Sequence, residues 1–125
     1  MGSQSYRDLL VWQKSIALCV LVYKACEVFP RSELYGLSDQ MKRAAVSISS
    51  NIAEGQGRQH TKEFLYFLSI ANGSSAELDT QRIIAESLHF LNPAQSARLD
   101  ESITEVRKML YALAARLKSE LKTEN

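Results

Sequence analysis

Apolar residues recur every three or four positions along most of this chain, which is the spacing of amphipathic α-helices. Four segments carry the pattern: Asp8 to Phe29, Ser38 to Gly55, Thr61 to Leu91, and Pro93 toward the C-terminus. A glycine or a proline lies in or beside every connection between them. The pattern predicts an all-α protein, an antiparallel up-down-up-down four-helix bundle. We expect one domain over residues 7–121, between a disordered leader at 1–6 and a frayed tail at 122–125.

The first predicted helix carries two apolar stripes instead of one. They consist of Leu9, Trp12, Ile16, Cys19, Tyr23 and Cys26, with heptad spacing, and of Val11, Leu18, Val22, Ala25 and Phe29. A helix that is apolar over most of its circumference needs cover on more than one side. No helix of a four-helix bundle is central, so we expect a second copy of the chain to cover part of this one.

The second predicted helix has two unlike faces. Its apolar stripe is rich in small residues, which lets a neighbouring helix approach closely. A polar row follows another face and consists of Gln40, Arg43, Ser47, Asn51, Glu54 and Arg58. Gly55 and Gly57 are expected to end the helix. A polar row in a closely packed contact indicates that these residues specify which helix pairs with which, rather than that they catalyse a reaction.

An antiparallel hairpin of the second and third helices sets the register of this polar row. Counting back from a turn near Gln59 places Ser47 and Arg43 beside the small-residue middle of the third helix. This register predicts an ion pair between Arg43 and Glu77, with Ser47 and Ser74 hydrogen-bonded beside it. A buried pair of this kind acts on the specificity of pairing more than on net stability.

The composition is that of an ordinary globular protein, with 46% hydrophobic and 23% charged residues. A net charge of +1 argues against a chain that binds nucleic acid over its whole surface. We see no signal peptide and no apolar run long enough to cross a bilayer. Cys19 and Cys26 share one helix face two turns apart, too far for a disulfide. We therefore expect a cytoplasmic protein with reduced thiols and no membrane partner.

No constellation of residues indicates catalysis or a cofactor. His60 and His89 lie at opposite ends of the third helix, so they cannot share a metal ion. Di-iron bundles need a Glu-x-x-His pair on each of two helices, and the sequence has only one such spacing, at Glu86 and His89. Ser47 has no histidine base at helical spacing, so a polar contact between helices is favoured over a nucleophile. We expect no catalytic, metal or cofactor-binding residues, and no enzyme activity.

A small basic rim is predicted at the turn between the second and third helices, where Arg58, His60 and Lys62 lie. On one copy such a rim is most often just a solvated loop. Repeated around a ring, it becomes a collar able to hold a phosphate backbone, with affinity that falls as salt rises. The candidate contacts to RNA or DNA are Lys14, Lys42, Arg58 and Lys62. Surface solvation is the more common role of such side chains.

Several short segments together resemble one known family. They are DLLVWQK at residues 8–14, ELYGL at 33–37, RAAVSI at 43–48, NIAEG at 51–55 and ELDTQ at 77–81. In this combination they are similar to the bacterial four-helix bundle proteins that are also called 23S ribosomal RNA intervening-sequence proteins. The resemblance extends from Tyr6 to about Leu117. Asn72 departs from it, because an Arg is expected at that position, and this removes one basic group.

The resemblance implies an antiparallel bundle that assembles as a homopentameric barrel. It also implies a relation to the accessory variability proteins of diversity-generating retroelements, which bind nucleic acid and a reverse transcriptase through a basic surface. No catalytic residue comes with the resemblance. Its motif positions are expected to serve structure and assembly, and they are Arg43, Ser47, Asn51, Glu54, Gly55 and Glu77.

Two functional hypotheses follow from these observations. The first is a non-enzymatic, ring-forming helical bundle that binds RNA or DNA as an accessory to a nucleic-acid process. The alternative is a protein–protein interaction scaffold without nucleic-acid binding, which the near-neutral net charge favours. By analogy with the family, a reverse-transcriptase-like protein is a further candidate partner.

Overall fold

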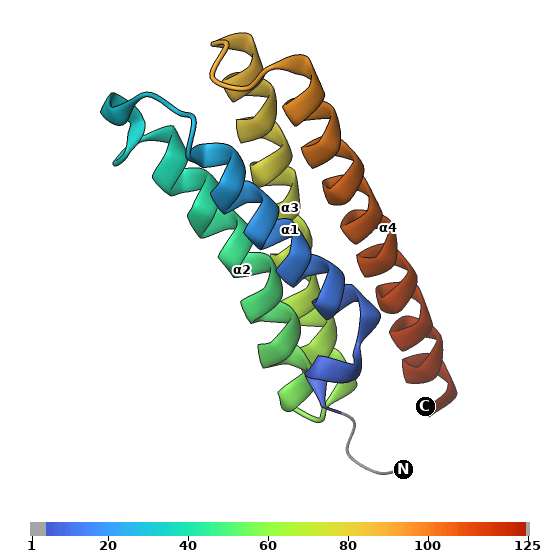
Figure 1. The fold of residues 1–125 in the computed structure, drawn as a ribbon. Helices are drawn as coiled ribbons and strands as arrows, with labels where there is room; N and C mark the ends of the chain where they lie inside the picture. Colours follow the sequence, from blue (N-terminus) through green and yellow to red (C-terminus); the bar gives the residue numbers. More distant parts are fainter. Residues whose placement is uncertain (1–4, 125) are drawn as a thin grey trace.

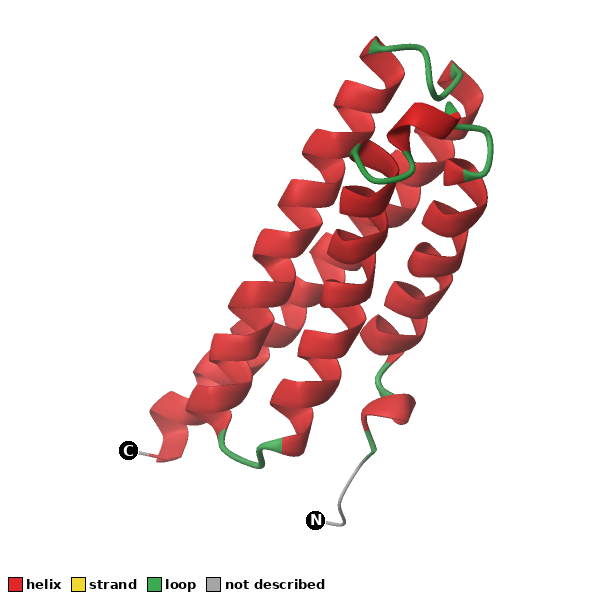
Figure 2. Cartoon of the chain, turned by 90° about the vertical axis from the view of Figure 1, so that its left-hand side faces the viewer, coloured by secondary structure: helices red, strands yellow, loops and turns green. Residues whose placement is uncertain are grey.

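Four long helices make up most of the structure, a computed structural model in which residues 5–124 are described. They are α1 (Leu10–Cys26), α2 (Leu37–Gly57), α3 (Thr61–Ser87) and α4 (Pro93–Glu124). Short 3₁₀ turns precede α1 and α2, namely η1 (Tyr6–Asp8) and η2 (Arg31–Glu33). The helices run alternately up and down (Figures 1 and 2), which confirms the predicted four-helix bundle. None of the helices within residues 5–124 is long and apolar enough to cross a membrane.

Each helix packs against two others. α1 contacts α2 and α4, and α3 contacts the same two helices, so α1 and α3 occupy opposite corners of the bundle. The connection with η2 and the connection between α3 and α4 lie at one end, and the α2–α3 turn lies at the other (Figure 1). This arrangement leaves every helix with one outward side.

The predicted leader and tail lie partly outside the described residues. Residues 1–4 and Asn125 are not described. Within the described part, the Ser5 hydroxyl accepts a hydrogen bond from the Arg7 N–H (3.1 Å), and Tyr6 begins η1. α4 is helical as far as Glu124, so fraying of residues 122–125 stays a prediction.

The core is formed by apolar side chains of all four helices. On α4 every position of the heptad-like series is buried: Leu99, Ile103, Val106, Leu110, Leu113 and Leu117. On α3 the apolar spacing predicts that Ile84 and Leu88 face inward as well, and this is wrong, because both are exposed and Ala85 takes the inward position. The outward side of α3 is therefore more apolar than the sequence pattern predicts.

The helix ends differ from the predicted ones by local chemistry. α1 ends at Cys26 rather than at the predicted Phe29, and Pro30 disfavours helical backbone at Phe29 itself. Phe29 instead packs on Phe90 with ring centroids 5.6 Å apart. Serine is a favoured N-cap residue, and its type and position predict that Ser38 caps α2, but Ser38 lies buried within the helix instead. The cap comes from Glu33, whose carboxylate accepts a hydrogen bond from the Leu37 N–H (3.0 Å).

The start of α4 is capped as its sequence predicts, with Asn as the N-cap residue and Pro at the first helical position. The Asn92 side-chain oxygen accepts a hydrogen bond from the Gln95 N–H at 2.8 Å. In return the Gln95 side-chain oxygen accepts one from the Asn92 N–H at 2.9 Å. This reciprocal pair is a capping box, and Pro93 occupies the first helical position beside it.

Candidate functional site

One side of α1 is covered by the chain itself, and the other side is not. The buried positions of this helix are Val11, Ser15, Leu18, Val22 and Cys26. In contrast, the side chains of Ile16, Val20 and Tyr23 are exposed, with exposed fractions of 50% for Val20 and 45% for Tyr23. We call these three residues the α1 face. The chain thus covers the predicted stripe that contains Leu18. Of the heptad stripe it leaves Ile16 and Tyr23 exposed, whereas Cys26 is buried.

A groove between α1 and α2 borders the α1 face on one side. It is lined by Tyr23, Asp39, Lys42, Arg43, Val46 and Ser47. The Nζ atom of Lys42 lies 5.1 Å from the centroid of the Tyr23 ring, within the range of a cation–π interaction. The charge of Lys42 is therefore held against the α1 face rather than extended freely into solvent.

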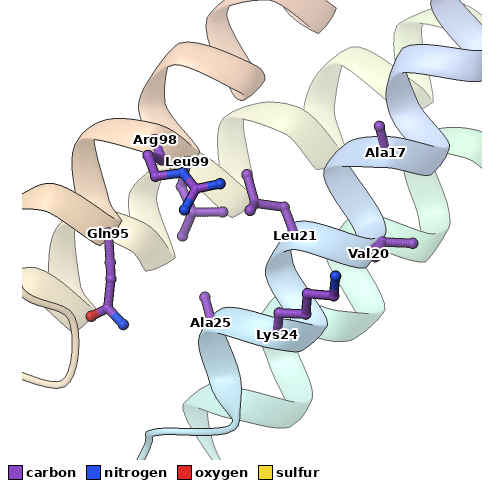
Figure 3. Close-up of a pocket in the computed structure, with 8 residues that line it drawn as sticks. All are labelled: Ala17, Val20, Leu21, Lys24, Ala25, Gln95, Arg98 and Leu99. Carbon is purple, nitrogen blue, oxygen red and sulfur yellow. The ribbon is translucent and has the colours of Figure 1, made fainter.

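A second groove, of about 600 Å³, borders the α1 face between α1 and α4. Figure 3 shows Leu21 of α1 pointing toward Arg98 and Leu99 of α4 across this groove. Val20 lines this groove and also a neighbouring hollow between α1 and α2, so it lies on the outward side of the helix. Two cationic side chains, Lys24 and Arg98, line the groove beside mostly apolar neighbours.

The polar row of α2 makes the contact with α3 that its register predicts. The hydroxyl oxygens of Ser47 and Ser74 lie 2.8 Å apart, which confirms their hydrogen bond. The side-chain amide of Asn51 donates to the carbonyl oxygen of Ser47 (2.8 Å) and to its hydroxyl oxygen (3.0 Å). All three side chains are partly buried. Their hydrogen bonds serve the helix contact and leave Ser47 without the features of a nucleophile.

The predicted ion pair between Arg43 and Glu77 is wrong. Arg43 Nε lies 2.9 Å from an Asp39 carboxylate oxygen one turn earlier on α2, and its side chain is 79% exposed. Arg43 lines the α1–α2 groove, so the carboxylate on its own helix is nearer than those of α3. Glu77 is exposed and takes part in none of the ion pairs among residues 5–124.

Gly55 does not end α2, contrary to the sequence prediction. The helix continues to Gly57, and the chain turns at Gln59, which has a left-handed φ of 65°. A Cβ atom at Gly55 would lie only 2.7 Å from Cβ of Phe67 and 2.9 Å from the Phe64 ring. Glycine is present because α3 comes so close at this point.

The four candidate nucleic-acid contacts lie on three different parts of the bundle. Arg58 and Lys62 flank the α2–α3 turn, as predicted, and Lys62 is exposed. Arg58 pairs with Glu54 (3.0 Å) and lies over the Phe67 ring, 5.2 Å from its centroid. Lys14 lies on α1 and pairs with Glu105 of α4 at 3.5 Å. Together with Lys42 in the α1–α2 groove, these positions form no single patch on one copy.

A charged network that the sequence did not reveal joins α3 to α4. The Arg82 side chain, only 12% exposed, contacts Asp79 (2.9 Å) and Asp100 (3.5 Å), and it donates to the Ser96 hydroxyl (2.8 Å). Ser96 in turn donates to Glu86 at 2.6 Å. The available signal was a lone Arg in an acidic stretch, with carboxylates three residues before and four after it.

The thiols and the histidines form no site within the described part of the chain. Cys19 and Cys26 are unpaired, and burial raises the pKa of both thiols, opposed at Cys26 by its hydrogen bond with Ser38 and by the charge of Lys42. Among residues 5–124, no group of three His, Cys, Asp or Glu side chains is placed to hold a metal ion. The polar side chains of the described residues therefore serve contacts between helices or lie exposed on the surface.

This chain is similar to known proteins both in sequence and in fold. A family model described as 23S rRNA-intervening sequence protein matches residues 7–112. Among solved structures, the chain is similar to a crystal structure of a protein with unknown function from the S23 ribosomal protein family of Bacteroides thetaiotaomicron. The TM-score is 0.76 at 23% identity, with 84% of this chain and 98% of that chain covered. This likeness shows the fold alone. No curated protein matches the sequence.

Proposed function

This chain belongs to the 23S rRNA-intervening sequence protein family, and from that premise we propose that it is a non-enzymatic bundle that assembles with copies of itself and binds RNA. The observation that carries the proposal is the uncovered α1 face, with half of Val20 and nearly half of Tyr23 in contact with water. Apolar surface that one copy leaves exposed contributes to association when a second copy covers it. We take the assembly to be a ring, and the family resemblance implies five copies.

RNA binding rests on the basic residues at the α2–α3 turn. Lys62 is exposed there beside Arg58, whose charge is shared with one carboxylate. On one copy these cations are too few to hold a polyanion tightly. A ring repeats them around one end, and each phosphate contact then releases counterions on binding. The family's description refers to 23S rRNA, so RNA is the nucleic acid that we propose.

The proposal assigns this protein no catalytic role and places it in the cytoplasm. Ser47, the candidate nucleophile, is engaged with Ser74 and Asn51 in the helix contact. The unpaired thiols suit a reducing compartment.

The test is retention of the purified protein on single-stranded and double-stranded RNA as the salt concentration is raised. We expect retention at low salt that falls steeply with salt. The double variant Arg58→Gln and Lys62→Gln should weaken binding about equally for all RNA sequences and reduce the salt slope by about one per lost phosphate contact. Arg31→Gln is the matched control, because Arg31 is also exposed but lies in η2, at the opposite end of the bundle.

The alternative is a protein–protein scaffold without nucleic-acid binding. It is favoured by the near-neutral net charge and by the ion pairs that neutralise Lys14 and Arg58. An assembled protein that fails to retain RNA even at low salt would establish this alternative. A reverse-transcriptase-like protein is then the first partner to try, by analogy with the family.

A further inference from the structure

The outward side of α3 carries a second uncovered surface, opposite the α1 face. Its apolar members Tyr66, Ile83 and Ile84 are exposed, and Gly73 and Glu77 lie between them on the same side of the helix. We call these five residues the α3 face. Because α1 and α3 occupy opposite corners of the bundle, the two faces point in different directions.

Gly73 is unexplained by contacts within the chain. It lies near the middle of a helix of 27 residues, where a glycine costs about 1 kcal/mol relative to alanine. A Cβ atom at this position would meet no atom of residues 5–124 within 4 Å beyond its own stretch of helix. At Gly55, in contrast, the approach of Phe67 makes glycine necessary. A helix that approaches α3 closely from outside the chain would account for Gly73 in the same way.

The two faces lie at matching heights along the bundle. The Cys26 thiol reaches the Ser38 carbonyl at 4.0 Å, so these residues are level on α1 and α2. Nine residues further down α2, Ser47 is level with Ser74 of α3. Nine residues back along α1 is Ala17, which is therefore level with Ser74. It follows that Ile16 is level with Gly73, and Val20 with Glu77.

The two faces also carry opposite charges, with lysines at the α1 face and a glutamate in the α3 face. Lys24 lies one turn after Val20 on the same side of α1, and Lys42 lies over Tyr23. The α3 face carries Glu77 instead. Neither Lys24 nor Glu77 takes part in an ion pair among residues 5–124. Two copies joined α1 face to α1 face would bring lysines together and would leave Gly73 unexplained.

We propose that copies of this chain join head to tail, with the α1 face of one copy on the α3 face of the next. In this contact Ile16 packs at Gly73, and Lys24 of one copy lies near Glu77 of the other. The contact is heterologous, so repetition of it closes a ring or extends a filament. The inference rests on the self-association in the proposed function and adds which two surfaces meet.

The test uses one variant in each face, studied alone and mixed. Val20→Glu places a carboxylate in the α1 face, and Gly73→Arg fills the open space on α3 with a bulky cation. Each variant alone should be monomeric, with the association constant lowered by a factor of about one hundred or more. An equal mixture should form a dimer, because the intact α3 face of the first variant still fits the intact α1 face of the second. Gly57→Arg is the control, since a Cβ atom there also meets nothing within 4 Å, and it should assemble like the wild type.

Each other outcome has a definite meaning. Gly73→Arg that still assembles while Val20→Glu does not would overturn the inference in favour of a two-fold contact of α1 faces. A mixture without dimer would overturn it too, as would a Gly73→Arg chain that loses its helical circular dichroism. A wild-type protein that is monomeric would instead refute the proposed self-association, on which the inference depends.

Discussion

Gly55 of α2 and Phe67 of α3 are in such close contact that a Cβ atom on Gly55 would lie 2.7 Å from Cβ of Phe67. Both atoms are fixed to backbone, so neither can move aside cheaply. We therefore expect Gly55→Ala to lower the free energy of unfolding by about 1–2 kcal/mol. The cost of overpacking is larger than the gain from the higher helix propensity of alanine. Urea unfolding at one protein concentration measures it. Gly57→Ala, with open space around its new methyl group, should be neutral within about 0.5 kcal/mol.

The hydrogen bond between Ser47 and Ser74 should appear as a coupling energy. Each single change to alanine is expected to lower the free energy of unfolding by about 1 kcal/mol, because it leaves the other partly buried hydroxyl with one partner fewer. The double variant should cost less than the sum of the two. A double-mutant cycle with urea unfolding measures this difference, and strict additivity would show that the contact contributes nothing.

Arg82 should matter far more for stability than Arg43. Arg82→Met removes a cation that is 12% exposed and leaves Asp79 and Glu86 without their shared partner. We expect a loss of about 2–4 kcal/mol in the free energy of unfolding. Arg43→Met removes only an exposed pair on one helix and should cost less than about 0.5 kcal/mol. Equal effects of the two substitutions would contradict the assignment of the α3–α4 network.

The thiols give a prediction for pH. Because burial raises the pKa of Cys26 and Cys19, the folded state holds these protons to a higher pH than the unfolded chain. The stabilisation from the neutral thiols is complete below the unfolded pKa, near 9, and is lost as the pH rises through the raised folded pKa. Cys26→Ala should therefore flatten the alkaline fall of the unfolding midpoint. An unchanged slope above pH 9 would contradict it.

Accessibility distinguishes the two thiols as well. Cys19 lines a hollow between α1 and α2 together with Val20 and Tyr23 of the α1 face, whereas Cys26 is 5% exposed. We expect a thiol reagent to label Cys19 much faster than Cys26 in dilute protein. Labelling of Cys19 should slow as the protein concentration rises and a second copy covers the α1 face. A rate independent of concentration would show that Cys19 stays open.

The fold was predictable because it depends on periodicity. The spacing of Leu99, Ile103, Val106 and Leu110 marks one face of α4, and all four are buried. The Ser47–Ser74 contact followed from helix rise and one assumed turn, which tolerates an error of about one turn. Asn92 was recognisable as a cap from its residue type and its position before Pro93.

Contacts that depend on the rotation of a helix about its own axis could not be predicted from the sequence spacing. Arg43 and Glu77 lie within a turn of each other in height, yet Arg43 turns into the α1–α2 groove and pairs with Asp39. A glycine near a helix end looks like a stop, and only the position of Phe67 shows that Gly55 allows close packing. Which stripe of α1 faces outward was undecided for the same reason, since both stripes are apolar.

The central claim is that the α1 face is covered by another copy of the chain, and sedimentation of the wild-type protein over a range of concentrations tests it most directly. The account predicts a mass several times the 14.0 kDa of one chain, and the mass of a single chain for Val20→Glu. A wild-type protein that sediments at 14.0 kDa at every concentration would contradict it.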